Sequence, residues 1–445
     1  MTERRTETQP TTVPEEARRA GEILGRWSWV ELSVWTQRML TALENGVKGG
    51  KWYSLMDKVY SMANLRSAFR MVKANKGSPG IDYQTIDDFA SRLEENLERV
   101  AQSLRDGRYR PQAIKRVWIP KPGSTEKRPL GIPTVRDRVV QAALRNVLEP
   151  VFEKDFADHS YGFRPGRGCK DALRRVDLLL KQGYTYVVDA DLKSYFDTIP
   201  HDLLMVRIRD KLADNRVLAL VALFLKQQIM ETTTGWTPET GTPQGAVLSP
   251  LLSNIYLDPL DHLMAQSGVN MVRYADDFVI LCRTEAEALL ALAMAQRWTA
   301  QAGLSLHPTK TRIVDATVLG GFDFLGYHFE LGKRWPRRKS EKKLKDAIRD
   351  KTRRRNGHSL FAIILDVNRT LRGWFEYFKH CHPFTFRVLD SWIRMRLRSI
   401  LRVRLGLRGR GRGADHQRWP NAFFADQGLF SLVTAHAKAS QSSRR

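Results

Sequence analysis

The alternation of apolar and polar positions predicts a chain of the α+β class. Between residues 169 and 330, segments with helical spacing of apolar residues alternate with short, nearly continuous apolar runs. Such runs, rich in Val, Ile, Phe and Tyr, are typical of β-strands. The runs predicted as strands cover residues 184–190, 271–273, 278–281 and 322–328.

After residue 331 the pattern becomes helical. Apolar positions recur at helical spacing through residues 347–354, 361–378 and 389–405, and a Gly- and Arg-rich run at 406–413 then ends the pattern. The chain therefore predicts a central unit that contains a sheet, followed by a unit built from helices.

Two adjacent acids interrupt the apolar pattern at Tyr274-Ala275-Asp276-Asp277. The apolar runs on both sides predict two strands, and a small residue followed by two Asp suits a tight hairpin between them. Two carboxylates held this close repel each other unless a cation offsets their charge. Alone, such a pair is more often a solvated loop, but a third acid nearby would favour a two-metal site for phosphoryl transfer.

A candidate for the third acid lies in residues 184–197, which begin as a strand and continue as a helix. Asp191 stands at the end of the strand, where a side chain can be displayed over the sheet edge. Asp189 points to the same face of the strand, so the residues alone do not decide whether Asp189 or Asp191 is the third acid. Asp197 starts or caps the next element. One such Asp and the hairpin pair can hold two Mg²⁺ ions, because Mg²⁺ prefers oxygen ligands.

Three loops could serve such a site. Residues 121–128 form a basic turn that could hold a triphosphate, although an exposed hairpin tip is the plainer interpretation. Residues 241–250 are a Gly- and Pro-punctuated loop, whose glycines permit a close approach of the backbone to a ligand. Residues 161–168 are a further basic turn. Each signal is weak by itself.

The charge of the chain favours a polyanionic partner. The 445 residues contain 73 Lys and Arg against 48 Asp and Glu, a net charge of +25. Such an excess works against compaction, so nucleic acid is the leading expectation. Residues 331–420 alone hold 26 Lys and Arg against 7 Asp and Glu, a net charge of +19. A basic helical face is usually only solvated, but three successive basic helices favour a surface that binds phosphates.

Other classes of protein are disfavoured. No apolar stretch approaches the roughly 18 residues of a membrane-spanning helix, and the N-terminus has no secretory signal, so we expect no membrane partner and a cytoplasmic location. The three cysteines, Cys169, Cys282 and Cys381, are far apart, which argues against a disulfide framework and a zinc ribbon.

A segment rich in Trp near the N-terminus has two interpretations. Residues 21–61 interleave Trp27, Trp29, Trp35 and Trp52 with Arg and Lys. Aromatic rings among cations can stack on single-stranded nucleic acid. Packing of the same rings in a helical core is at least as plausible, and both interpretations stay open.

Taken in the order in which they occur along the chain, the motifs resemble those of the bacterial group II intron-encoded reverse transcriptases, which are also maturases. The resemblance covers residues 65–432, and although each motif is weak, the ordered set is very specific. Its blocks are Gly77-Ser78-Pro79-Gly80-Ile81-Asp82, Ile119-Pro120-Lys121-Pro122 with Arg128-Pro129-Leu130-Gly131-Ile132-Pro133, residues 161–168, residues 191–197, Pro243-Gln244-Gly245 with Leu248-Ser249-Pro250, residues 274–277, residues 306–311, Phe324-Leu325-Gly326-Tyr327, residues 372–378, residues 419–424 and residues 428–432.

The resemblance implies a catalytic set. The metal ligands of this family fall on Asp191, Asp276 and Asp277, which decides between the strand-end acids in favour of Asp191 over Asp189. The implied cofactor is a pair of Mg²⁺ ions.

The resemblance also implies contacts with the nucleotide. Lys121 and Arg128 fall where the family holds the triphosphate, and Gln244 falls beside the incoming sugar. Phe196 falls at the steric gate, where an aromatic ring crowds a ribose 2′-hydroxyl. Lys310 falls near the leaving pyrophosphate, although a plain surface lysine is an almost equally good interpretation.

The implied fold is a right-handed fingers–palm–thumb polymerase with a helical, basic thumb or maturase region. The expected parts are a disordered tail at 1–20, a helical N-terminal extension at 21–61, fingers at 62–168, a palm at 169–330, a thumb or maturase domain at 331–405 and a C-terminal DNA-binding segment at 406–445.

The implied function is RNA-directed DNA synthesis by two-metal nucleotidyl transfer, which copies intron RNA into DNA and assists intron splicing and mobility. The expected partners are group II intron RNA, an RNA template with a DNA primer, target DNA and dNTPs. Two other functions remain: a domesticated reverse transcriptase for defence, diversification or repair, and an RNA-binding splicing cofactor. The presence of all three acids, Asp191, Asp276 and Asp277, argues against a protein that serves only as a splicing cofactor.

Two features depart from the family pattern. The chain ends at Arg445 without the paired Cys and His of an endonuclease domain, so we expect the second strand to be primed from existing ends or replication forks. Ala246 stands where relatives often have a second glycine, which we do not interpret as inactivating.

Overall fold

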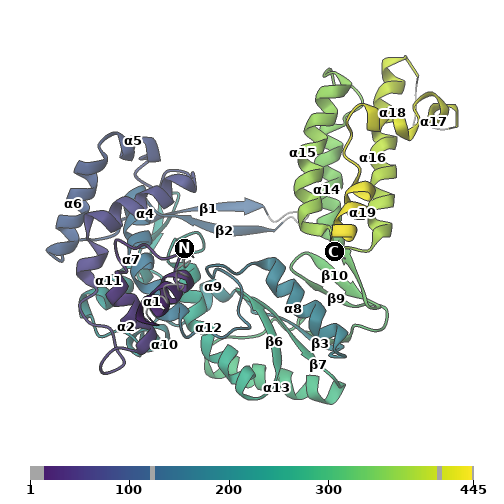
Figure 1. The fold of residues 1–445 in the computed structure, drawn as a ribbon. Coiled ribbons are helices and arrows are strands. Elements are labelled where there is room, and N and C mark those ends of the chain that lie inside the picture. Colours follow the sequence, from purple (N-terminus) through teal and green to yellow (C-terminus); the bar gives the residue numbers. More distant parts are fainter. Residues whose placement is uncertain (1–14, 121–125, 408–412, 443–445) are drawn as a thin grey trace, which may run out of the picture.

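A computed structural model of the chain describes residues 15–120, 126–407 and 413–442. Figure 1 shows helices and a long hairpin on one side, a sheet below them, and a separate bundle of helices at the C-terminal end. Lys121 of the expected triphosphate clamp and most of the Gly- and Arg-rich run lie outside the described residues. No helix among the described residues is long and apolar enough to cross a membrane.

The N-terminal half consists mainly of helices and one four-stranded sheet, which we call the hairpin sheet. Its strand order is β2-β1-β4-β5, with β1 antiparallel to β2 and parallel to β4. The strands β1 and β2 extend away from the helices toward the C-terminal bundle (Figure 1). The elements are α3 (Met56–Val59), α4 (Met62–Ala74), α5 (Ile86–Ser91), α6 (Leu93–Arg105), β1 (Ile114–Pro120), β2 (Lys127–Ile132), α7 (Val135–Glu153), α11 (Asn215–Leu225), β4 (Ile229–Glu231) and β5 (Thr234–Trp236).

The second sheet lies in the middle of the chain, and we call it the central sheet. Its order is β6-β7-β3-β8, and all neighbouring strands are antiparallel. Its elements and helices are α8 (Cys169–Lys181), β3 (Tyr186–Asp191), α9 (Tyr195–Thr198), α10 (His201–Arg209), α12 (Ser249–Gln266), β6 (Asn270–Tyr274), β7 (Asp277–Cys282), α13 (Glu285–Gln301) and β8 (Arg312–Asp315).

The central sheet separates two hydrophobic cores. Successive side chains of a strand point to opposite faces, so Val188 and Ile280 join the core of the N-terminal helices, α12 and α13. Val187 and Val279 join a second core that includes α8, a small sheet and the C-terminal helices. The sheet is therefore buried on both faces along most of its length.

The C-terminal part is a small antiparallel sheet followed by a helical bundle. The small sheet has the order β11-β10-β9, and aromatic side chains such as Phe322 and Phe329, stacked at 5.0 Å, fill its face. The elements are β9 (Phe322–Phe324), β10 (Tyr327–Glu330), β11 (Lys333–Pro336), α14 (Arg338–Lys351), α15 (Leu360–Phe378), α16 (Pro383–Arg404), α17 (Ala414–Arg418), α18 (Asn421–Asp426) and α19 (Leu432–Ser442).

The structure differs from the sequence-based elements at three places. Residues 15–20, within the expected disordered tail, form the start of α1 (Glu15–Arg26). The strand expected at 322–328 is two strands, because Leu325 and Gly326 adopt left-handed φ angles of 47° and 84° and turn the chain. The helix expected at 347–354 begins earlier, at Arg338, where charged residues concealed its periodicity.

The Trp-rich segment is packed into the N-terminal core. Trp35 is fully buried, its Nε1 donates a hydrogen bond of 3.0 Å to the backbone oxygen of Asn146, and its ring meets Trp52 edge-on. Trp27 is buried as well and lies near α2 (Gln37–Asn45), where its Nε1 donates to Glu44. The indoles of Trp27 and Trp35 are core side chains, while Trp29 and Trp52 are partly buried against the same core.

Replacement of Trp35 by Ala therefore tests the core interpretation. Because a large buried ring is removed, we expect the free energy of unfolding to fall by about 3–5 kcal/mol in chemical denaturation. Tyr53→Ala is the control, since this ring is 60% exposed, and we expect a change within about 0.5 kcal/mol. Unchanged stability of Trp35→Ala with weaker RNA binding would instead favour the stacking interpretation.

Candidate active site

The central sheet brings the predicted acids together. In the antiparallel register of β3 and β7, Asp191 is the direct partner of Asp277. The strands β6 and β7 form a hairpin in which Tyr274 pairs with Asp277, so Ala275 and Asp276 make its two-residue turn. Ala275 has a left-handed φ of 59°, which a turn of this type requires. The expected hairpin and the expected strand-end position of Asp191 are both present.

A buried arginine supports this turn from beneath. Arg273 is fully buried, and its Nη1 donates 2.9 Å to the backbone oxygen of Ala275 and 3.0 Å to Oδ1 of Asn254. Its Nε donates 2.7 Å to Oδ1 of Asp261, which is also fully buried, and its Nη2 donates to the other carboxylate oxygen. The Asp261 carboxylate raises the pKa of Arg273, so the guanidinium is a fixed positive charge directly under the acids.

The loop of residues 161–168 covers the turn from the other side. The Tyr161 amide donates 2.9 Å to the Arg273 oxygen, and Asn254 Nδ2 donates 2.8 Å to the Gly162 oxygen. A Cβ at Gly162 would lie 2.2 Å from the Ala275 nitrogen, so only glycine fits. In the same loop, Arg164 is buried and paired with Glu153 at 2.8 Å. This basic turn, a weak signal in the sequence, is a structural support.

The electrostatics of the acids indicate mutual repulsion. Burial above all, and then the carboxylates of Asp189, Asp276 and Asp191, raise the pKa of Asp277 from 3.8 to about 7 against the opposing effect of Arg337. Burial and Asp191 also raise the pKa of Asp276. A bound cation would relieve this repulsion, because it favours the ionised forms.

The two strand-end acids of β3 have different partners. Asp191 forms an ion pair with Lys310, while Asp189 lies 3.4 Å from Arg312 of β8. Among the residues that the structure describes, no three His, Cys, Asp or Glu side chains are arranged to hold a metal ion. The strand register thus brings the backbones of Asp191, Asp276 and Asp277 together. Their carboxylates do not converge on one point, because the Asp191 side chain is turned to Lys310.

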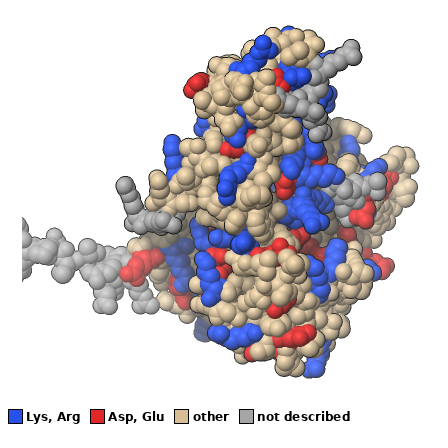
Figure 2. Space-filling model, turned by 90° about the vertical axis from the view of Figure 1, so that its right-hand side faces the viewer, with Lys and Arg blue, Asp and Glu red and all other residues tan. Residues whose placement is uncertain are grey.

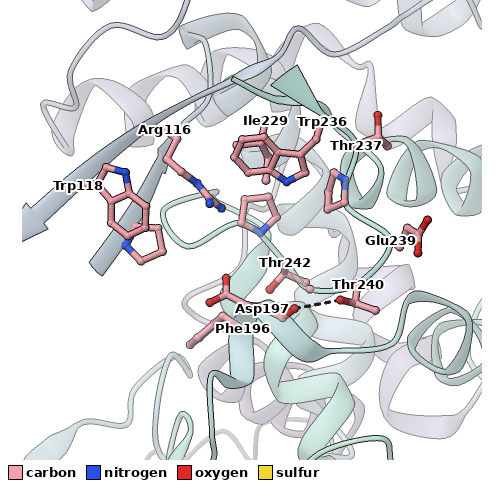
Figure 3. Close-up of a pocket in the computed structure, with 14 residues that line it drawn as sticks. Arg116, Trp118, Phe196, Asp197, Ile229, Trp236, Thr237, Glu239, Thr240 and Thr242 are labelled. Carbon is pink, nitrogen blue, oxygen red and sulfur yellow. Dashed lines mark hydrogen bonds between the residues drawn. The ribbon is translucent and has the colours of Figure 1, made fainter. Parts of the chain in front are cut away.

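The predicted gate residue follows β3. Phe196 lies in α9, a helix of only four residues that begins after Ser194, whose φ is 49°. The preceding ring, Tyr195, is buried, and its hydroxyl donates 2.8 Å to the Ser253 oxygen. Phe196 borders a cavity of about 500 Å³ between the hairpin sheet and α9. Figure 3 shows Phe196 and Asp197 on one side of it and Arg116 with two Trp rings on the other.

The remaining predicted nucleotide contacts lie on the hairpin sheet and the loop beside it. Arg128 is exposed on β2, opposite Ile119 of β1. Gln244 is partly buried in the loop, and its backbone oxygen accepts a 2.6 Å hydrogen bond from the amide of Gly131, which lies on β2 like Arg128. The neighbouring Gly245 has a φ of 104°, and a Cβ there would lie 2.5 Å from the Gly131 oxygen. The loop and β2 are thus in direct backbone contact.

Sequence reasoning missed the residues that hold the turn: Arg273, Asp261, Asn254 and Gly162. One signal was present, since an Arg inside an otherwise apolar strand must find a buried partner. The partner itself, 12 residues earlier in α12, could not be chosen from the sequence, because α12 carries two acids, Asp258 and Asp261.

Lys and Arg side chains are prominent on the face of the molecule at the C-terminal end. Figure 2 shows Lys and Arg side chains spread over this face and gathered toward its middle, with fewer Asp and Glu side chains among them. Arg residues of α15 and α16 with exposed side chains include Arg369, Arg372 and Arg387. Exposed cations on successive helices suit a phosphate backbone.

Comparison with protein families places this architecture among reverse transcriptases. Residues 119–329 match the reverse transcriptase (RNA-dependent DNA polymerase) family, and residues 341–418 match the maturase-specific domain of group II introns. The first match contains the predicted catalytic acids and gate residue, and the second contains α14 to α16 with α17.

Two relatives strengthen this placement. Protein YkfC of Escherichia coli K12 is 34% identical over 302 residues, which are 59% of this chain and 79% of YkfC. The group II intron-encoded protein LtrA of Lactococcus lactis subsp. cremoris is 41% identical over 201 residues, which are 45% of this chain and 33% of LtrA. The chain belongs to the family of group II intron-encoded reverse transcriptases and maturases, and its match spans about a third of LtrA.

The matches among solved structures are more distant. A partial Cas6-RT-Cas1–Cas2 complex matches with a TM-score of 0.37 and 24% identity over 56% of this chain and 41% of that chain. Telomerase from Candida albicans matches with a TM-score of 0.41 and 13% identity over 71% of this chain and 64% of that chain.

With the family established, the architecture is the expected fingers–palm–thumb fold. The assignment of the parts stays a prediction, in which the hairpin sheet and its helices form the fingers, the central sheet the palm and the bundle from α14 onward the thumb. The resemblance inferred from the order of motifs is confirmed.

The raised pKa of Asp277, caused first by burial and then by the neighbouring carboxylates, predicts that Asp277→Asn stabilises the metal-free protein at neutral pH. A carboxyl whose pKa rises on folding binds its proton more tightly in the folded chain, so the free energy of unfolding falls as pH rises from about 4 to 7. At pH 8 in chelator, we expect Asp277→Asn to unfold with a free energy higher by on the order of 2 kcal/mol, and the difference should vanish near pH 4.

The control is Asp426→Asn, which changes an exposed carboxylate far from the site. Thermal and urea unfolding at several pH values measure both variants. If Asp277→Asn followed the wild-type pH profile with a constant offset, the proposed repulsion at Asp277 would be wrong.

Proposed function

We propose that this chain is an RNA-directed DNA polymerase of a group II intron that extends a DNA primer along an RNA template. The observation that carries the proposal is the register of the palm, in which Asp191 lies opposite Asp277 and Asp276 occupies the turn beside them. Three carboxylates at one sheet edge, inside a reverse transcriptase match, suit nucleotidyl transfer.

Two Mg²⁺ ions are the proposed cofactor, and the donors fit them. All three side chains offer only carboxylate oxygens, which Mg²⁺ prefers, and the pKa of Asp277 is raised by burial and by the neighbouring carboxylates, an effect that a bound cation would oppose. Convergence on the ions requires Asp191 to leave Lys310. When bound, the ions would activate the primer 3′-hydroxyl and stabilise charge on the phosphates.

The protein's own side chains would bind and orient the nucleotide. Arg128 on β2 would hold the triphosphate together with Lys121, and Gln244 would lie beside the sugar. Lys310, once released from Asp191, would be near the pyrophosphate, where its charge is favourable. Phe196 would crowd a 2′-hydroxyl and so favour deoxynucleotides.

A second part of the proposal concerns the thumb. Support comes from the maturase-specific match at residues 341–418 and from the exposed arginines of its helices. We propose that this region binds the parent intron RNA and stabilises its splicing-competent fold, while target DNA contacts the C-terminal helices.

Asp276→Asn tests the catalytic assignment. The substitution removes one anionic ligand without changing side-chain volume, so primer extension on an RNA template with Mg²⁺ and dNTPs should fall by at least about 10³-fold. RNA affinity should stay within about twofold of the wild type, because the change is remote from the basic thumb.

Asp189→Asn is the matched control, since Asp189 lies on the same strand face but pairs with Arg312. We expect it to retain synthesis within about tenfold of the wild type. Loss of synthesis in Asp189→Asn and not in Asp276→Asn would overturn the assignment. If the wild type itself makes no DNA but binds RNA tightly, the function is that of a splicing cofactor.

Phe196→Ala tests the gate. Removal of the ring opens space for a 2′-hydroxyl, so the preference for dNTPs over NTPs, measured as the ratio of kcat/KM values, should fall by about 10- to 100-fold. Tyr195→Phe is the control, because it keeps the ring and loses only the hydrogen bond to Ser253. An unchanged ratio in Phe196→Ala would remove Phe196 as the gate.

A further inference from the structure

The proposed gate ring is not held by close packing on all sides. Phe196 is partly buried, and on one side it borders the cavity of about 500 Å³. Its helix, α9, has four residues, and so short a helix is not stable by itself. A ring next to open space can select against one hydroxyl group only if its backbone is fixed by something else.

A loop from the neighbouring part of the palm fixes this backbone. The Thr242 amide donates 2.6 Å to the Phe196 oxygen, and the Gly241 amide donates 2.8 Å to the Ile199 oxygen. The Thr240 hydroxyl donates 3.1 Å to the Asp197 oxygen, a bond drawn in Figure 3. Together, three successive loop residues bind two carbonyl groups of α9 and that of Ile199, the residue after it.

The approach of this loop is as close as a backbone allows. Gly241 has a φ of 87°, and a Cβ at this position would lie 2.7 Å from the Phe196 oxygen and 2.8 Å from Asp197. Any displacement of Gly241 would therefore displace the residue that carries the ring. What holds Gly241 in place decides how well the ring is positioned.

His201 provides that anchor. Its Nε2 lies 2.6 Å from the Gly241 oxygen, a distance at which Nε2 carries the proton and donates it. The side chain is 8% exposed, and its Nδ1 is buried without a hydrogen-bond partner among the described residues. Within that part of the chain, the only polar contact made by this buried imidazole is thus the one to the loop. Its position at the start of α10 ties the loop to a palm helix.

We propose that His201 is a positioning residue for the gate: it holds Gly241, and through Gly241 and Thr242 it fixes Phe196 against displacement into the cavity. The inference rests on the proposed role of Phe196 in selecting deoxynucleotides. Because the polar contact of the His201 ring within the described residues is the one to the Gly241 oxygen, it would act through the loop.

The test compares four variants of the full-length protein in primer extension on an RNA template. The readout is the ratio of kcat/KM for a dNTP to that for the matching NTP. His201→Ala should lower this ratio about tenfold, mainly through a gain with the NTP, while dNTP incorporation changes about threefold or less. His201→Gln places an amide donor near the Nε2 position and should restore most of the ratio.

His262→Ala is the matched control, because this histidine also contacts a backbone oxygen, that of Asp155 at 2.9 Å, but lies away from the gate. It should leave the ratio unchanged. Thermal unfolding of each variant shows whether it folds, and His201→Gln keeps the test valid if His201→Ala does not.

Phe196→Ala separates the two possible failures. If Phe196→Ala leaves the ratio unchanged, the gate itself is wrong. If Phe196→Ala lowers the ratio but His201→Ala and His201→Gln both keep the wild-type value, the gate stands and the positioning role of His201 is overturned. Equal losses of dNTP and NTP incorporation in His201→Ala, without rescue by Gln, would also overturn it, since they indicate a general structural role.

Discussion

The buried ion pair between Arg273 and Asp261 is the interaction on which the catalytic edge depends. Neither side chain is exposed, and the guanidinium also binds Asn254 and the Ala275 oxygen. Removal of one partner from such a pair typically costs about 3–5 kcal/mol, because the other charge is left buried alone. The position of the acids at the hairpin turn therefore depends on this buried network in the palm, and the turn cannot move without breaking it.

The two cores explain how a thumb with its own helices stays joined to the palm. Alternate residues of β3 and β7 enter different cores, so the strands that end in Asp191 and begin with Asp277 pack against α13 on one face and against α8 and β9 on the other. The first core continues into the N-terminal helices and the second into the C-terminal helices. A substitution in either core changes the support of the same sheet edge. The position of the acids is consequently sensitive to packing in both halves of the chain.

The sequence predicted what local patterns encode. The hairpin at Ala275 and Asp276, the strand before Asp191 and the helices of the thumb follow from periodicity and turn chemistry, and the order of motifs identified the family. It could not predict the contacts between distant segments. The partner of Arg273, the approach of Gly162 to Ala275 and the contact of His201 with Gly241 depend on tertiary packing, and the ion pair of Asp191 with Lys310 joins residues 119 positions apart. The roles of the individual site residues remain predictions.

Strand β2 connects two of the proposed nucleotide contacts. Arg128 stands near one end of the strand, and three residues later the Gly131 amide binds the Gln244 loop. A strand rises about 3.3 Å per residue, so these two points are about 10 Å apart. Under the proposed function, the phosphate end and the sugar end of one nucleotide would both be contacted from this one strand. The spacing of the two points along β2 would then have to match the distance between the two ends of the nucleotide. A slip of β2 against β1 by one pair would then misplace both ends together.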